Sequence, residues 1–354
     1  MHMSSRMPFS SSARQRGVTL TELMIALVLG ALVVLAATAM VATSRSTYRT
    51  QDEGTRLAES ARFGLELGNR LVRLAGYTNF GDDASPPAAY FDTTYAAWKI
   101  SPDSYADTGP EIVGSNNSKP TVGAAINGSD SLTIRYFGTS QPNTTTTLNG
   151  GIPDGNILDC AGFAVPQPAQ NGVAYSASRA YNVLFVDLDV DGEPALRCRR
   201  QTYDAAGNPN TGVNRFDTQT LIRGVEDFQV LYGELLPSPG LPLDDLDSLE
   251  LPGRPRTLVY RSGIGGPNPV VEWSNVRSVK IAMLLRSATG TRPDPEPAAT
   301  VYNLFGSIYP SGSDPGATFS LAALSTAERT RVRRVVETTV FVRNRVATWP
   351  SLQQ

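Results

Sequence analysis

The chain is poor in two residues that enzymes use often, histidine and lysine. Its 354 residues include one histidine, His2, at the extreme N-terminus, and only three lysines. If that end is removed, no imidazole is left for Ser-His-Asp or Cys-His catalysis or for a histidine-based metal site. An enzyme made from this chain would have to use carboxylates, Lys, Tyr or Ser-Lys chemistry.

The sequence also lacks the short motifs of common catalytic and nucleotide-binding sites. It contains no G-x-S-x-G, no P-loop, no H-E-x-x-H and no dinucleotide fingerprint. The 31 basic and 33 acidic residues leave a net charge of −2, which gives no electrostatic support for binding nucleic acid. Apolar residues make up 41%, enough for a packed core in one large or two ordinary domains.

An uncharged apolar run follows a basic N-terminus. Residues 1–17 carry three arginines and no acid, and residues 23–42 carry no charge. A helix of that length spans about 30 Å, which matches the hydrocarbon core of a bilayer. Because the arginines precede the run, we expect the N-terminus to stay in the cytoplasm and the rest of the chain to cross the membrane.

One carboxylate, Glu22, lies at the start of this apolar run. At membrane depth it needs a partner, whereas at the headgroup level it costs little. The segment RGVTLTE (residues 16–22) resembles the processing site of type IV pilins and pseudopilins. The resemblance implies that a prepilin peptidase cuts after Gly17, that Val18 becomes the N-methylated terminus, and that Glu22 is the assembly carboxylate. Val18 stands where the family usually has Phe.

The expected partner of Glu22 is a cation inside the assembled fibre. Among packed apolar helices, the free α-amino group of a neighbouring subunit can supply that cation and so set the axial register. Two other readings of the N-terminus stay open. One is a signal peptide cut after residues 37–39, although the apolar run is longer than the roughly 7–15 residues usual there. The other is a plain membrane anchor on an unrelated domain.

Beyond the apolar run, the pattern predicts that one helix continues from residue 18 to about residue 75. Small and apolar residues recur in steps of three and four, and charged pairs lie off that stripe. Three glycines weaken the helix locally, and Gly76 is a plausible stop. The stripe consists of Ala58, Ala61, Leu65, Gly68, Val72 and Ala75. A membrane anchor with a dimerising stalk predicts the same periodicity.

After residue 76 the sequence predicts a β-rich head with long loops. Asp191-Gly192 is a hairpin turn signal, and Ser325 to Glu328 is a capping box. Residues 81–180 and 235–270 read mainly as loops rich in Gly and Pro. The expected strands are residues 132–137, 182–190, 195–199, 225–232, 276–285 and 335–346.

Several segments of this head resemble the PilW family of minor pilins. They are residues 74–77, 224–226, 232–233, 273–286 and 333–345, in an order that the family shares. Cys160 and Cys198 fit the family's paired cysteines, which implies a disulfide; two free thiols are the alternative. The expected fold is α+β and pilin-like, with a long N-terminal helix, apolar in its first half, packed on an antiparallel sheet. The expected parts are a leader (1–17), the apolar and amphipathic halves of the helix (18–42 and 43–75) and an extracytoplasmic head (76–354).

An acidic turn is the one candidate metal site. Asp187, Asp189 and Asp191 resemble the first half of a calcium loop, but position twelve would be Cys198 instead of Glu. A solvated hairpin end is the alternative reading. No other cofactor is expected. Residues 244–247 read as a solvated acidic loop, and the aromatic residues between 90 and 105 read as a small satellite core or a partner surface.

The resemblance implies a non-enzymatic minor pilin at or near the pilus tip, which primes assembly and supports adhesion and twitching motility. Its expected partners are other minor pilins, the major pilin, a PilY-type tip adhesin, prepilin peptidase and, before assembly, the inner membrane. No nucleic acid is expected directly. The head would be periplasmic first and extracellular in the pilus. The rivals are a type II secretion pseudopilin of GspJ type and a membrane-anchored extracytoplasmic enzyme or binding domain.

Overall fold

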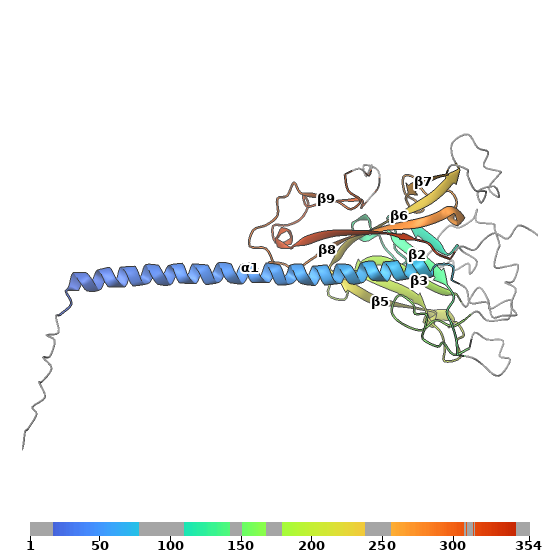
Figure 1. Cartoon of the computed structure of the whole chain (residues 1–354), viewed down its shortest axis with the longest axis horizontal. Coiled ribbons are helices and arrows are strands. Elements are labelled where there is room, and N and C mark those ends of the chain that lie inside the picture. Colours follow the sequence, from blue (N-terminus) through green and yellow to red (C-terminus); the bar gives the residue numbers. More distant parts are fainter. Residues whose placement is uncertain are drawn as a thin grey trace, which may run out of the picture. The chain divides into compact units, whose positions relative to one another are not determined.

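The computed structural model describes residues 17–77, 110–141, 151–167, 179–237, 256–307, 309, 314 and 316–344. The chain divides into two compact units, residues 1–51 and 52–354. Helix α1 (Leu20–Leu74) begins in the first unit and ends in the second (Figure 1). The helix predicted for residues 18–75 is therefore confirmed to within two residues at each end.

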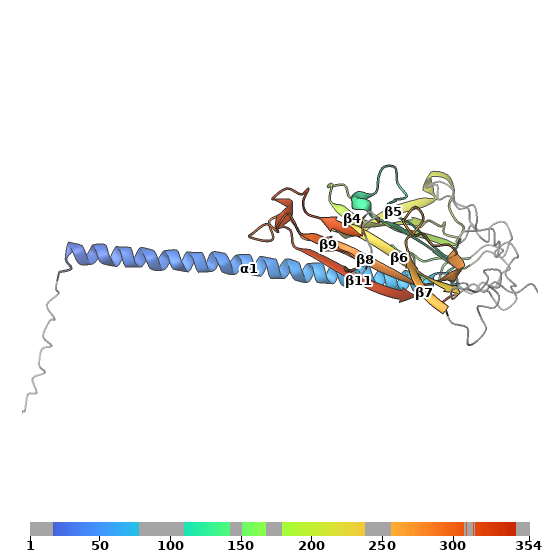
Figure 2. The same ribbon diagram turned by 90° about the horizontal axis from the view of Figure 1, so that it is seen from above.

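The second unit, which we call the head, contains two antiparallel sheets and a separate strand pair. The first sheet has five strands, in the order β1 (Ile112–Ser115), β2 (Ser131–Tyr136), β3 (Ala180–Leu188), β4 (Pro194–Gln201) and β5 (Phe216–Arg223). The second sheet has four strands, in the order β11 (Arg333–Phe341), β8 (Val276–Arg286), β6 (Val225–Pro237) and β7 (Arg256–Arg261). These four strands are labelled in Figure 2. The separate pair is β9 (Val301–Asn303) with β10 (Thr318–Ser320).

A single glycine joins the two sheets. Gly224 lies between β5 and β6, with a φ of +77° that favours glycine. A Cβ there would approach the carbonyl oxygen of Arg286 to 2.6 Å. The Gly224 N–H donates to the Pro194 carbonyl (2.8 Å), and the Gly224 carbonyl accepts from the Arg286 N–H (2.7 Å). The turn is therefore hydrogen-bonded to both sheets at once.

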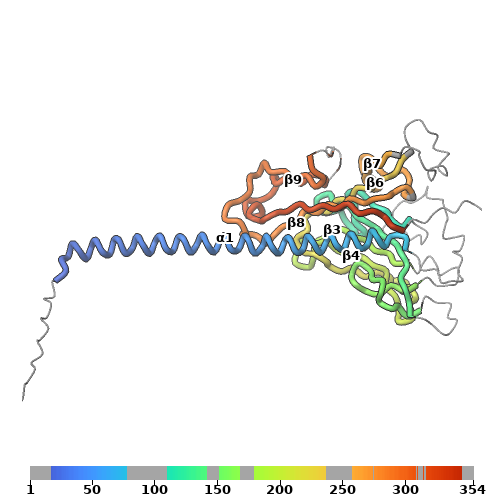
Figure 3. The backbone as a smooth tube through the Cα atoms, viewed as in Figure 1, coloured from blue at the N-terminus to red at the C-terminus, as the bar shows by residue number. Residues whose placement is uncertain are grey.

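The second half of α1 packs against both sheets through two glycines. A Cβ on Gly64 would lie 2.8 Å from Ile222 of β5 and from Met283 of β8, and one on Gly68 would lie 2.9 Å from Ile281. Figure 3 shows this stretch of the helix alongside β3, β4 and β8. The fully buried residues of α1 are Leu57, Ala61, Gly64, Leu67, Gly68, Leu71 and Val72.

This contact corrects the predicted helix stripe. Ala58 and Leu65 of that stripe are only half-buried, while Leu57, Gly64 and Leu67 lie at the centre of the contact. The helical periodicity shows that one face of α1 is apolar, but it does not settle which neighbouring residues lie at the centre of that face. Glycine is also easily overlooked, because it contributes little to a hydrophobicity scale. Two of the three glycines that weaken the isolated helix, Gly64 and Gly68, are thus the residues that let it approach the sheets.

The sheet of β11, β8, β6 and β7 is covered on both faces. One face adds Phe228, Val230 and Ile281 to the core beneath α1. The other face contributes Leu231, Ala282 and Leu284 to a smaller core, in which they pack against residues from the segment around β9 and β10. The residues of that segment are Leu304, Phe305, Ala317, Phe319 and Leu321.

All six predicted strands are present in the structure. Four of them are one to five residues longer or shorter than predicted, and the other two are shifted by one or two residues. The strands that were not predicted are β1, β5, β7, β9 and β10. The predicted loop of residues 235–270 is wrong in part, because it contains the end of β6 and all of β7. Strand β5 was missed because its sequence, FDTQTLIR, is polar, as suits an edge strand. The capping bond is confirmed, since the Glu328 N–H donates to Ser325 Oγ (3.2 Å). The acidic residues 244–247 and the aromatic residues 90–105 lie outside the described residues.

A network of buried ion pairs ties the start of β6 to the start of β11. Glu226 accepts from Arg333 (2.7 Å) and from Arg286 (2.9 Å), and both its carboxylate and Arg333 are almost fully buried. Arg286 also pairs with Glu193 in the β3–β4 turn (2.6 Å). Removing one member would leave an uncompensated buried charge, so the network fixes how these segments align.

Among the described residues, the buried carboxyl group of Asp227 has no basic partner. Its Oδ1 accepts from Ser129 Oγ (3.0 Å) and Gln229 Nε2 (2.9 Å), while its buried Oδ2 has no hydrogen-bond partner in this part of the chain. Burial, with the neighbouring Glu226 adding to it, raises the pKa of Asp227 to about 8. The group is therefore protonated in the folded head at neutral pH.

We predict that Gly64→Leu destabilises the head by about 2 kcal/mol, because the larger side chain overpacks the contact with Ile222 and Met283. Gly54→Leu is the matched control, since a Cβ there meets nothing within 4 Å. Leucine is the better helix former, so the control should be neutral or up to about 1 kcal/mol stabilising. Denaturant unfolding of the full chain measures both. Equal effects of the two substitutions would contradict the close helix–sheet contact.

We also predict that Asp227 makes the head less stable as the pH rises. Because its folded pKa is above its unfolded one, its contribution is fully present below the ordinary aspartate pKa of 3.8 and is lost as the pH rises through its folded pKa of about 8. Asp227→Asn should remove this part of the slope and stabilise the head relative to wild type at pH 8. Unfolding curves between pH 5 and 8 test this, with the exposed Asp294→Asn as control. An unchanged slope in Asp227→Asn would refute the assignment.

Candidate functional site

Glu22 lies in the first turn of α1, where it and Thr19 cap the helix reciprocally. The Thr19 N–H donates to Glu22 Oε2 (2.9 Å), and the Glu22 N–H donates to Thr19 Oγ1 (3.3 Å). The Thr19 hydroxyl also donates to Glu22 Oε2 (2.9 Å). This capping box satisfies two helix-start amides and holds the carboxylate at the beginning of the helix. The sequence was interpreted for Glu22 but not for Thr19. The T-x-x-E spacing of a capping box would have identified Thr19 as its partner.

The predicted processing residues precede the helix. Gly17 and Val18 have no regular secondary structure, and α1 begins two residues after Val18. Val18 is 72% exposed, and a Cβ on Gly17 would meet nothing within 4 Å. The peptide bond between them is therefore accessible in the chain by itself. The preceding leader residues, 1–16, lie outside the described residues.

The first half of α1 is apolar and uncovered by its own chain. Every residue from 17 to 45 is exposed. By length and composition α1 could cross a membrane, and none of its most apolar window is buried. The large side chains left exposed include Leu23, Met24, Ile25, Leu27, Val28, Leu29, Leu32, Val33, Val34 and Leu35. Such a surface requires an apolar environment, either lipid or other helices.

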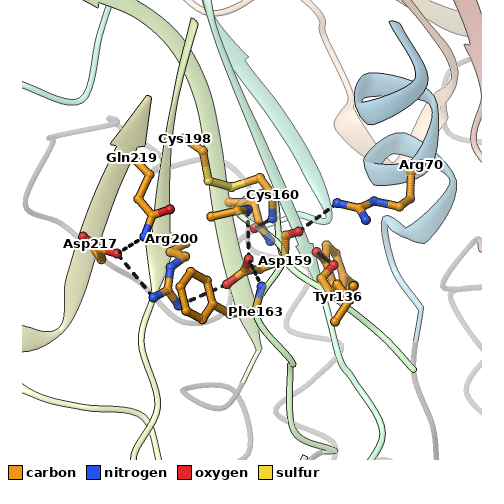
Figure 4. Close-up of a disulfide and its surroundings, with 12 residues drawn as sticks. Arg70, Tyr136, Asp159, Cys160, Phe163, Cys198, Arg200, Asp217 and Gln219 are labelled. Atoms are coloured by element: carbon orange, nitrogen blue, oxygen red, sulfur yellow. Dashed lines mark hydrogen bonds and ion pairs between the residues drawn. A yellow bond between two sulfur atoms is a disulfide. The ribbon is translucent and has the colours of Figure 1, made fainter. Parts of the chain in front are cut away.

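The predicted disulfide between Cys160 and Cys198 is present (Figure 4). Cys198 lies on β4, and Cys160 lies in the described loop segment of residues 151–167. Next to it, Asp159 pairs with Arg200 (3.1 Å), whose guanidinium stacks on Phe163 at 3.7 Å. The Asp159 carbonyl accepts from Arg70 Nη2 on α1 (2.9 Å). The bridge thus anchors this loop to β4, beside a hydrogen bond that links it to the helix.

The three aspartates of the candidate calcium turn each have other partners. Asp187 pairs with Lys119 (2.7 Å) and accepts from the Thr121 hydroxyl (2.9 Å). Asp189 and Asp191 both pair with Arg223, at 2.8 and 3.2 Å. Within the described residues, no group of three or more His, Cys, Asp or Glu side chains is placed to hold a metal ion. Calcium would have to displace Lys119 and Arg223, and its binding here stays an untested prediction.

Two protein-family models match separate parts of the chain. The model of the prokaryotic N-terminal methylation motif matches residues 12–38, and the model of the type IV pilus-assembly protein W family, PilW, matches residues 183–344. No curated protein matches the chain. Among solved structures, a type IV-like pilin from Thermus thermophilus is similar, at 14% identity and a TM-score of 0.33, over 82% of this chain and 98% of that one.

The two family matches lie in different compact units of the chain: the methylation motif lies within residues 1–51, and the PilW match lies within residues 52–354. The methylation motif includes Gly17, Val18 and Glu22 at the start of α1. The PilW match begins within β3 and ends at Asn344, and so includes Cys198 and the Glu226–Arg333 pair. The chain therefore carries a PilW-family domain over residues 183–344 and a prokaryotic N-terminal methylation motif over residues 12–38, and these two matches support a PilW-type minor pilin of the type IV pilus.

Proposed function

We propose that this minor pilin acts at or near the tip of the pilus, where it primes assembly and supports a PilY-type adhesin, and so contributes to adhesion and twitching motility. The observation that carries the proposal is the uncovered apolar half of α1 with a single carboxylate at its start. A helix of this kind can exchange a lipid environment for a bundle of like helices at little cost, because both are apolar. The tip position and the adhesin are carried over from the family resemblance.

Glu22 is the residue that makes this exchange selective. In a bundle of apolar helices a carboxylate is costly unless a cation meets it. The free α-amino group of a neighbouring processed subunit is such a cation, and the major pilin and other minor pilins would supply it. The bonds from Thr19 hold the Glu22 carboxylate at the helix start, so that it can accept the amine at one axial register only.

The proposed function also predicts the compartments through which the chain passes. The precursor would lie in the inner membrane, with its N-terminus in the cytoplasm and its head in the periplasm. Prepilin peptidase would cut after Gly17 and leave Val18 to be methylated, and the head would reach the cell exterior with the pilus. The Cys160–Cys198 bridge agrees with an oxidising compartment for the head.

Two rivals differ in what they predict for cells. A type II secretion pseudopilin of GspJ type would share the N-terminal features but would serve secretion, and the match to the PilW family favours the pilus. A membrane-anchored extracytoplasmic enzyme or binding domain would need neither processing at Gly17 nor a carboxylate at position 22. We therefore propose a structural, non-enzymatic role.

We predict that Glu22→Ala lowers the number of surface pili about tenfold, as expected from losing one charge-assisted contact. The mutation is made in cells of the source organism, and pili are counted by electron microscopy. Glu59→Ala is the matched control, because Glu59 is an exposed carboxylate on the same helix outside the apolar run. It should leave the count unchanged.

Secretion and twitching are measured in the same strains. Loss of pili and twitching with normal secretion is the expected result. Loss of secretion with normal pili would favour the pseudopilin, and full function of Glu22→Ala would favour a simple membrane anchor.

A further inference from the structure

A pocket of about 590 Å³ lies beside the C-terminal end of α1. The helix contributes its last turns, and the chain that follows β11 forms the other side. The pocket is rich in arginine and also has an apolar part. Its lining includes Arg70, Arg73, Leu74, Tyr77, Arg343 and Asn344.

The charge of this pocket is unbalanced. Its one carboxylate, Glu66, pairs with Arg62 (2.9 Å). Arg70 donates to a backbone carbonyl, that of Asp159. Among the described residues, the exposed guanidinium groups of Arg73 and Arg343 have no hydrogen-bond or ion-pair partner. In the described part of the chain, positive charge therefore borders the pocket without a matching anion.

Capping of the helix does not explain these arginines. Basic residues in a last turn often bind the terminal carbonyl groups. Here the Leu71 and Val72 carbonyls accept from the Ala75 N–H, and the Leu74 carbonyl accepts from the Tyr77 N–H. The Arg73 carbonyl accepts from Asn344 Nδ2 (2.9 Å). All four terminal carbonyl groups are therefore satisfied without any guanidinium.

The Arg343-Asn344-Arg345 segment belongs to the residues that resembled the PilW family, and the structure separates the roles of its first two members. Asn344 closes the end of α1 through its bond to Arg73. Arg343, next to it, contributes only charge to the pocket rim. Arg73 and Arg343 reach the same pocket from α1 and from the chain after β11, so the packing of these two elements brings the two charges together.

We propose that this pocket binds an acidic peptide segment of a neighbouring subunit, with Arg73 and Arg343 each receiving a carboxylate. Planar guanidinium groups bind carboxylates through paired hydrogen bonds. Leu74 and Tyr77 offer an apolar surface to the side chains between the acids. The identity of the donor as a pilus subunit rests on the proposed function, whereas anion binding by the pocket does not.

A peptide fits the observations better than a nucleic acid does. The whole chain has a net charge of −2, so outside this pocket it offers a long polyanion no overall electrostatic attraction. Three arginines gathered at one pocket match a few carboxylates, while nucleic acids are bound along extended basic grooves.

The test uses the purified full chain in detergent micelles and a short, fluorescein-labelled, glutamate-rich peptide, followed by fluorescence anisotropy. We expect saturable binding that weakens as NaCl is raised from about 50 to about 500 mM. Arg343→Gln and Arg73→Gln should each weaken binding about tenfold, as expected for hydrogen bonds to a charged group. Arg334→Gln should leave the affinity unchanged, because this arginine is exposed on β11 away from the pocket lining.

Two further probes make the outcomes decisive. The same peptide with glutamine in place of each glutamate should not bind. Equal binding of the glutamine peptide, or equal losses in Arg334→Gln and Arg343→Gln, would overturn the proposal. Tighter binding of a single-stranded oligonucleotide that depends on Arg73 and Arg343 would also overturn it, in favour of a nucleic-acid site. Because no pilus is involved, failure here leaves the Glu22 experiment unaffected.

Discussion

The apolar half of α1 has to be covered by something other than its own chain, and the rest of the molecule is arranged around that requirement. Covering one large apolar side chain is worth about 1.5–3 kcal/mol, and the exposed run contains at least ten of them. Against that total, one carboxylate at the start of the run costs little in lipid headgroups and much in an unpaired helix bundle. In the function we propose, the helix therefore drives association, and Glu22 restricts association to partners that supply a cation.

The other half of the same helix has a different task, which is to pack against the two sheets. Gly64 and Gly68 bring its backbone close to β5 and β8, one strand from each sheet. Gly224 and the Arg286–Glu193 ion pair then fix the sheets to each other. The disulfide adds a loop to this framework beside the bond from Arg70. Force applied to the helix would thus reach both sheets directly.

Much of this could be predicted from the sequence, and the failures have physical causes. The helix and the β3–β4 hairpin follow from local signals, an uncharged apolar run and an Asp-Gly turn. The cysteine pair follows from the resemblance of the head to the PilW family. Strand β5 could not be predicted, because a polar edge strand differs little from a loop. Strand β7 was hidden in a segment rich in Pro and Gly. The roles of Gly64, Asn344 and Arg223 depend on partners far away in the sequence, which no local pattern encodes.

The central claim is that the chain works as a processed pilin, with Glu22 five residues into the mature protein. The most direct measurement is the mass and N-terminal sequence of the mature protein from cells that contain a prepilin peptidase. The account predicts a chain that starts at Val18 and carries one added methyl group on its α-amino nitrogen. A chain that starts at Met1, or one that starts after Ala39, would contradict it, because no processed terminus would then lie next to Glu22.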